Sequence, residues 1–183
     1  MAGKLTVRNL VLVSIIASLL CLSALICIPS TVPITLQTLV LFLSLFSFGG
    51  KITTAATTVY IALGLIGLPV FSGFSGGIGR LFDATAGFII GMLFCALLWW
   101  LTERYFSRLN PAVRSVACLG VIYLTGALWY HLIYLGADAN VITTLAITVI
   151  PFIVPDAIKI YIAYRISKRI APLITPHEQR ENK

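Results

Sequence analysis

The chain has 183 residues, of which 59% are hydrophobic and 10% are charged, and its formal net charge at pH 7 is +7. This composition excludes an ordinary soluble domain, in which about 25% of residues carry a charge, and it indicates an integral membrane protein. Short polar segments between long apolar stretches hold the basic residues, so the excess charge does not form the basic face of a nucleic-acid-binding protein.

Apolar stretches follow one another along the chain, and several approach the roughly 20 helical residues that are needed to cross a bilayer. We therefore expect an all-α fold in which residues 1–183 form a single membrane domain with six transmembrane helices. The expected helices cover residues 8–28, 36–48, 52–66, 85–104, 113–135 and 141–168, and a polar tail follows at 170–183.

Glycine and proline set several of these boundaries. Gly49 and Gly50 predict a sharp turn between the second and third helices. Asn110 and Pro111 are helix-stopping residues in the polar loop between the fourth and fifth helices. The last apolar stretch has two interpretations. It is either one kinked helix, or a re-entrant segment that ends near Ile150 and is followed by a final helix.

The second and third expected helices are short, because each would span only about 20 Å of a hydrocarbon layer about 30 Å thick. The irregular segments next to them, 29–38 and 67–86, both lie on the outer side, and they are available to fill the rest of the layer. Irregular backbone at membrane depth is tolerated where protein or a water-filled cavity satisfies it. These lengths predict a cup that opens to the outside.

The distribution of basic residues gives the expected orientation. If both termini are cytoplasmic, eleven of the thirteen basic residues lie on the inner side, as the positive-inside rule requires. We therefore expect a multi-pass protein of the cell membrane that contacts lipids. The inner residues would be Lys4, Arg8, Lys51, Arg104, Arg108, Arg114, Arg165, Lys168, Arg169, Arg180 and Lys183.

Two opposite charges interrupt the last apolar stretch. Asp156 and Lys159 are three residues apart and share one face of a helix. Isolated charges at this depth cost several kcal/mol, so the two side chains are expected to face the protein interior or water. We interpret them as the floor of a site for a small solute. The alternative is a structural ion pair that fixes the helix.

The irregular segment at 67–86 contributes further candidates. Arg80 is suited to clamp a carboxylate through its planar fork, or else it is a solvated loop residue. Gly76 and Gly77 would let backbone amides approach a ligand closely, or else they only make the connection flexible. Aromatic side chains expected to line an apolar slot are Phe71, Phe74 and Phe88.

A stripe of small residues marks the first expected helix and lies within an arc of about 120°. Such stripes allow close packing against another helix, either within the chain or in a partner protein. Its residues are Ser14, Ala17, Ser18, Cys21 and Ala24.

Motifs for catalysis, metal binding and ATP hydrolysis are missing from the sequence. The four cysteines form no C-x-x-C pair, and no phosphate-binding G-x-x-x-x-G-K-[ST] motif occurs. We therefore expect neither an enzyme nor a metal site, and any active transport would take its energy from another subunit. The alternatives are an intramembrane enzyme acting on a lipid-soluble substrate through a buried aspartate, and a purely structural membrane subunit.

Three segments in order, "VPITLQTLV", "GLIGLPVFSGFSGGIGRLFDATAGFIIG" and "PFIVPDAIK", carry a family resemblance. They contain P-x-T-x-Q, L-P-V-F with S-G-G, and P-F-x-x-P-x-x-x-K with aspartate after the second proline. With these motifs the chain resembles the BioY family, the biotin-binding S components of energy-coupling-factor (ECF) transporters. One departure lies at residues 83–88, where the family tends to read G-P-T-G-G-Y and this chain reads D-A-T-A-G-F.

The resemblance implies a six-helix membrane protein that captures biotin from outside and docks to a transmembrane coupling subunit carrying two ATPase subunits. The chain itself would hold no cofactor, and ATP would be used by those partners. The loop from Val32 to Gln37 would close over the ligand, and the small-residue stripe of the first helix would dock the coupling subunit. An S component for a different vitamin is the related alternative.

Biotin suits the charged and polar candidates. Its ureido ring offers two N–H donors and a carbonyl, and its tail ends in a carboxylate, so Lys159 and Arg80 are expected near the carboxylate or the ureido oxygen. Asp156, Gln37 or Thr35 would accept hydrogen bonds from the ring. Thr85 is a further ligand-binding candidate.

Overall fold

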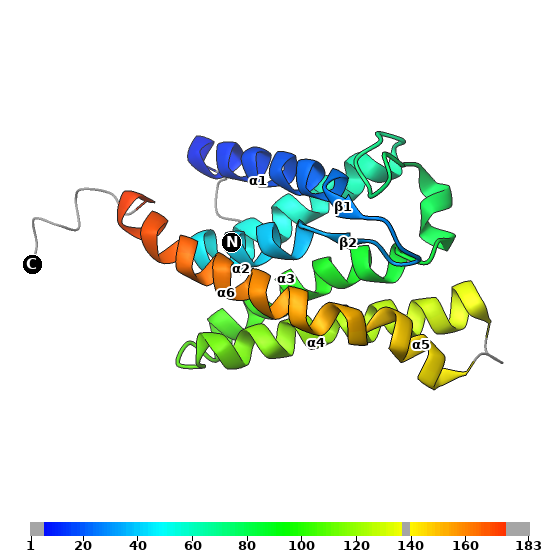
Figure 1. Cartoon of the computed structure of the whole chain (residues 1–183). Coiled ribbons are helices and arrows are strands. Elements are labelled where there is room, and N and C mark those ends of the chain that lie inside the picture. Colours follow the sequence, from blue (N-terminus) through cyan, green and yellow to red (C-terminus); the bar gives the residue numbers. More distant parts are fainter. Residues whose placement is uncertain (1–5, 137–139, 175–183) are drawn as a thin grey trace, which may run out of the picture.

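A computed structural model of the chain describes residues 6–136 and 140–174, and its main elements are helices (Figure 1). The expected all-α membrane class is confirmed, since five helical stretches among these residues are long and apolar enough to cross a bilayer. The helices are α1 (Val7–Leu25), α2 (Gln37–Leu65), α3 (Ala86–Tyr105), α4 (Pro111–Trp129), α5 (Val141–Thr148) and α6 (Ile150–Ile174). Short elements are β1 (Cys27–Ile28), β2 (Ile34–Thr35), the 3₁₀ turn η1 (Ile78–Phe82) and the π-helical turn η2 (Tyr130–Leu135).

Helix α2 folds back on itself at Gly49. The backbone there is non-helical, with φ 79° and ψ 171°, a conformation that favours glycine. The side-chain amide of Gln37 donates to the Tyr60 hydroxyl at 2.7 Å. An unbroken helix would hold these residues about 34 Å apart, so the two arms of α2 must lie against each other. Counting the arms separately gives six apolar helical segments, if α5 and α6 are taken as one.

The turn between the arms is fixed by α3. The Glu103 carboxylate accepts hydrogen bonds from the Gly50 amide and from Trp99 Nε1, both at 2.8 Å. A Cβ atom on Gly50 would lie 2.3 Å from the backbone nitrogen of Trp100, so only glycine allows this approach. The predicted turn therefore requires glycine twice: Gly49 for its backbone conformation and Gly50 for its close packing against α3.

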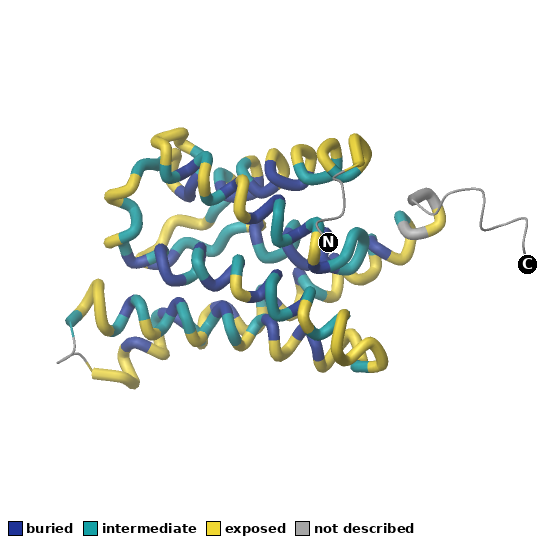
Figure 2. The backbone as a smooth tube through the Cα atoms, turned by 180° about the vertical axis from the view of Figure 1, so that it is seen from behind, coloured by how far each residue is buried: buried dark blue, intermediate teal, exposed yellow. Residues whose placement is uncertain are grey.

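The arms of α2 are central to the bundle, because α1, α3 and α6 all pack against α2, while α4 packs on α3. Buried residues lie on the facing sides of these helices, and exposed residues lie on the outside (Figure 2). Leu41, Phe42, Tyr60 and Trp99 are among the large side chains of the core. Many exposed residues are also apolar, as expected for a surface that faces lipid.

The chain after α1 is more ordered than its sequence indicated. Helix α1 ends at Leu25, not at residue 28, and Cys27 and Ile28 pair antiparallel with Thr35 and Ile34. Proline favours an extended residue before it, which suits Ile28, the residue preceding Pro29. The resulting hairpin, residues 27–35, connects α1 to α2.

The last apolar stretch is a bent path of two helices. Helices α5 and α6 follow one another across a break at Val149 (Figure 1), where φ is −122° and ψ is −55°. The two helices form a kinked path, and the break lies near Ile150, where the second interpretation ended its first segment. Pro151 lies in the first turn of α6, where its missing N–H costs nothing. Helix α6 continues to Ile174, beyond the expected end at 168, and residues 175–183 of the expected tail lie outside the described residues.

Candidate functional site

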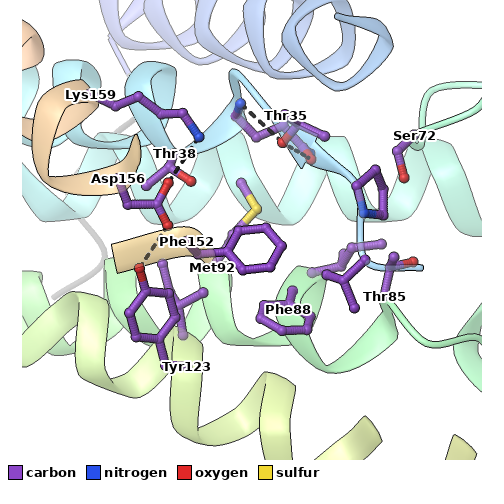
Figure 3. Close-up of a pocket in the computed structure, with 15 residues that line it drawn as sticks. Thr35, Thr38, Ser72, Thr85, Phe88, Met92, Tyr123, Phe152, Asp156 and Lys159 are labelled. Carbon is purple, nitrogen blue, oxygen red and sulfur yellow. Dashed lines mark hydrogen bonds and ion pairs between the residues drawn. The ribbon is translucent and has the colours of Figure 1, made fainter. Parts of the chain in front are cut away.

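A cavity of about 60 Å³, the inner cavity, lies where the hairpin after α1 meets α2, α3, α4 and α6 (Figure 3). Its lining has two polar ends that are separated by apolar side chains. Asp156, Lys159 and Tyr123 form one end, and Ser72 and Thr85 form the other. The inner cavity therefore offers hydrogen-bonding groups at both ends of an apolar space.

The Asp156 carboxylate is the centre of the first polar end. Its Oδ1 accepts a hydrogen bond from the Lys159 ammonium at 2.9 Å, and its Oδ2 accepts one from the Tyr123 hydroxyl at 3.0 Å. Asp156 is 3% exposed and Lys159 is 8% exposed. Since both carboxylate oxygens have a partner, the buried charges are compensated, while the ammonium keeps further N–H groups for another acceptor.

Tyr123 was not among the candidates that the sequence provided. It lies in α4, and Asp156 lies 33 positions later in α6, so no local pattern connects them. The available signal was its phenol within an apolar helix, because a buried tyrosine hydroxyl usually needs a hydrogen-bond partner.

Thr35 and Gln37 lie beside this end of the inner cavity and hold each other in place. The Thr35 hydroxyl donates to Gln37 Oε1 at 3.1 Å, and the backbone N–H of Gln37 donates to Thr35 Oγ1 at 3.3 Å. The Gln37 side chain is also fixed by its hydrogen bond to Tyr60. Thr38, one residue further along α2, lines the same wall.

Apolar side chains form the middle of the inner cavity. Phe88 and Met92 project from α3, Ile122 from α4 and Phe152 from α6. The rings of Phe88 and Phe152 pack with their centroids 6.1 Å apart. The sequence had suggested Phe88 as an apolar wall residue, whereas Met92, Ile122 and Phe152 come from helices whose inward faces it did not resolve.

The second polar end holds an unsatisfied group. The Thr85 hydroxyl oxygen is buried and has no hydrogen-bond partner among the described residues. Buried polar atoms normally have a partner, so this hydroxyl is available to a bound molecule.

A second, outer cavity of about 350 Å³ adjoins this end and shares Pro33, Ser72 and Thr85 with the inner cavity. Arg80 lines the outer cavity and not the inner one. Its guanidinium pairs with Asp83 and donates to the Ser72 carbonyl at 3.4 Å. Arg80 therefore lies beside the Thr85 end of the inner cavity and not beside Asp156.

The other candidates of segment 67–86 lie outside both cavities. Phe71 is buried beneath Tyr60, with ring centroids 5.5 Å apart, and Phe74 is 70% exposed. Gly76 packs so closely on the Leu68 carbonyl that a Cβ would lie 2.1 Å from its oxygen. Gly77 has φ +94° and forms a turn before η1.

The small-residue stripe of α1 is divided between the interior and the surface. Ala17 and Ala24 are buried in the chain itself, and Cys21 is half-buried. Ser14 and Ser18 are exposed, and their hydroxyls donate to carbonyls one turn earlier in α1. This edge of the stripe is therefore the part that lies on the surface of the described chain, and its hydroxyls are already hydrogen-bonded within α1. Within residues 6–136 and 140–174, no group of three potential metal ligands comes together.

Comparison with known sequences gives one family. A sequence model described as the BioY family matches residues 1–175. A Thermotoga maritima protein named biotin transporter BioY is 34% identical over 168 residues, covering 91% of this chain and 97% of that protein. A Rhodobacter capsulatus protein of the same name is 33% identical, covering 90% of this chain and 93% of that protein.

Comparison with solved structures gives the corresponding fold. A crystal structure described as the S-component for biotin from an ECF-type ABC transporter matches with a TM-score of 0.76 and 23% sequence identity. The match covers 93% of this chain and 94% of that one. At this level of identity the comparison shows a shared architecture.

Proposed function

Because the chain belongs to the BioY family, we propose that it is the biotin-binding component of an ECF-type transporter and not an enzyme. Biotin would bind in the inner cavity, with Asp156 and Lys159 as its main polar contacts. The observation that carries this proposal is the buried, internally compensated charge cluster facing a cavity with an apolar middle.

The arrangement of the inner cavity matches the chemistry of biotin. Biotin has a polar ureido group and a carboxylate, with an apolar ring and chain between them. Tyr123, Asp156 and Lys159 offer both donors and acceptors at one end, and Thr85 and Ser72 offer hydroxyls at the other. Arg80, in the adjoining outer cavity, adds a cation on the side of Thr85.

Binding requires the hairpin to move. The inner cavity, at about 60 Å³, is much smaller than the roughly 300 Å³ or more that is usual for small-molecule sites. Val32 and Pro33 line it at the tip of the hairpin, and Val32 packs against Ala84, Tyr130 and Phe152. Lifting this tip would join the inner and outer cavities and admit the ligand.

Uptake would depend on partners that supply energy. We assign these roles to a transmembrane coupling subunit and two ATPase subunits, and we place both termini of this chain in the cytoplasm, following the distribution of basic residues. Ser14 and Ser18 are the exposed part of the proposed docking stripe. Lipids of the cell membrane would surround the remaining apolar surface.

The proposal is tested with the purified full-length chain and a panel of vitamins. The chain is titrated with biotin, thiamine and riboflavin in turn, and the molecular mass of the recovered ligand is then measured by mass spectrometry. We expect saturable binding of biotin only, with the recovered biotin unchanged. Binding of another vitamin in place of biotin would indicate a different S component, and a chemically altered ligand would indicate an enzyme.

A further inference from the structure

An apolar groove of about 470 Å³ lies on the surface between α4 and α6, away from the inner and outer cavities. Helix α4 packs on α3 and α6 packs on α2, and the groove lies between the two helices. Val116 and Leu119 line it from α4, and Ala157, Ile160 and Tyr164 line it from α6. Its walls are mainly aliphatic and aromatic, which suits a hydrocarbon chain.

A basic pocket of about 380 Å³ adjoins one end of this groove, and Tyr161 lines both spaces. Arg165 and Arg169 line the basic pocket and are one helical turn apart on α6. Arg165 donates to the Tyr161 hydroxyl at 2.9 Å. Lys168 lies over the ring of Tyr164, another groove residue, at 5.3 Å from its centroid.

Among the described residues, no carboxylate forms an ion pair with these basic side chains. In the part of the chain that the structure describes, the two ion pairs join Arg80 to Asp83 and Lys159 to Asp156, and neither involves Arg165, Lys168 or Arg169. Pro111, the first residue of α4, also lines the groove, so this end of the groove lies at the polar boundary between α3 and α4. An apolar groove thus leads to a cluster of exposed cations, Arg165, Lys168 and Arg169.

We propose that this groove and the adjoining pocket form a binding site for an anionic phospholipid. One acyl chain would lie between α4 and α6, and the phosphate would contact Arg165 and Arg169. Charge complementarity selects this occupant. A second apolar helix would bring no anion to the two arginines, and a zwitterionic lipid would bring its own cationic group beside its phosphate, whereas an anionic phospholipid carries a net negative charge. The groove and the basic pocket share no lining residue with the inner cavity.

The test uses native mass spectrometry of the full-length chain in detergent, with phosphatidylglycerol or phosphatidylcholine bearing identical acyl chains. We expect wild type to retain phosphatidylglycerol preferentially. The variant Arg165→Gln/Arg169→Gln should weaken that retention by roughly 30-fold, because each cation near a membrane surface contributes about fivefold. The variant Lys51→Gln/Arg104→Gln removes the same charge from two exposed residues that line neither the groove nor the basic pocket, and it should retain lipid as wild type does.

A second pair of variants tests the groove itself. Ala157→Phe fills it, whereas Ala117→Phe places the same ring on an exposed part of α4 outside the groove. We expect only Ala157→Phe to lose bound lipid, with helical content unchanged by circular dichroism. Equal retention of the two lipids by wild type, wild-type retention by the Arg165/Arg169 variant, or a lipid-free dimer seated on this face would overturn the proposal.

Discussion

Tyr123 gives the buried ion pair a neutral third member. Its hydroxyl donates to Asp156 Oδ2, so it restrains the carboxylate without changing the net charge of the cluster. Lys159, about one turn further along α6, donates to the other carboxylate oxygen. The three groups therefore form one hydrogen-bonded unit at this end of the inner cavity.

Replacing Tyr123 with phenylalanine is expected to weaken biotin binding about fivefold, since one hydrogen bond contributes about 1 kcal/mol. Calorimetric titration measures this change. Tyr105→Phe, at a side chain that is 67% exposed, is the matched control and should bind like wild type. An unchanged Kd in Tyr123→Phe would mean that Asp156 is held by Lys159 alone.

The stability of the charge pair can be separated from its role in binding. Asp156→Asn leaves the Lys159 charge buried and unpaired, which is expected to cost about 3–5 kcal/mol. The double variant Asp156→Asn/Lys159→Gln removes both charges and should be less destabilised than Asp156→Asn. Unfolding midpoints of the detergent-solubilised proteins show which of the two variants is more stable. A purely structural pair predicts that the double variant, once folded, still binds biotin, whereas we expect binding to be lost.

At the scale of elements, the turn within α2 places Gln37 beside Tyr60 and so positions one wall of the inner cavity. Its geometry depends on Gly49, which adopts a positive φ, and on Gly50, which contacts the α3 backbone. The Glu103 carboxylate then caps the second arm of α2 through the Gly50 amide.

Gly50→Ala is expected to destabilise the protein strongly, because its Cβ would overlap backbone atoms of Trp100. Overpacking of this kind typically costs about 1–3 kcal/mol, and contact with backbone places it at the upper end. Gly120→Ala is the control, since nothing lies within 4 Å of a Cβ there. A thermal melt in which Gly50→Ala matches Gly120→Ala would contradict the described turn.

Local sequence signals were sufficient for the helical class, for the turn at Gly49 and Gly50, and for the shared face of Asp156 and Lys159. These features depend on residues that are close together in the chain. The pairing of Cys27 with Thr35, the contact between Tyr123 and Asp156, and the placement of Arg80 in an outer cavity depend on how separate segments pack. The sequence alone also did not show that Phe71 and Gly76 serve packing around Leu68 and Tyr60.

At the scale of the whole molecule, the inner cavity and the proposed docking surface are on different faces of the α1–α2 unit. Ser18 is exposed on α1, while Gln37 faces the inner cavity from α2. This separation makes ligand capture and coupling to partners independently testable.

Ser18→Trp is expected to leave biotin binding unchanged and to abolish ATP-driven uptake, because a large side chain prevents close helix packing. Uptake of labelled biotin into cells that contain the coupling subunit and ATPases measures the second effect. Leu19→Trp places the same side chain elsewhere on the exposed surface of α1 and should transport normally. Normal uptake by Ser18→Trp would remove Ser18 from the docking surface.

The most direct test of the central claim is a calorimetric titration of the purified chain with biotin. It compares wild type with Asp156→Asn, Lys159→Gln and the exposed control Lys51→Gln, after each is confirmed to be folded. We predict stoichiometric binding by wild type and Lys51→Gln, and at least about tenfold weaker binding, or about 1.4 kcal/mol, in the other two variants. Wild-type affinity in both Asp156→Asn and Lys159→Gln, or no binding by wild type, would contradict biotin capture at this site.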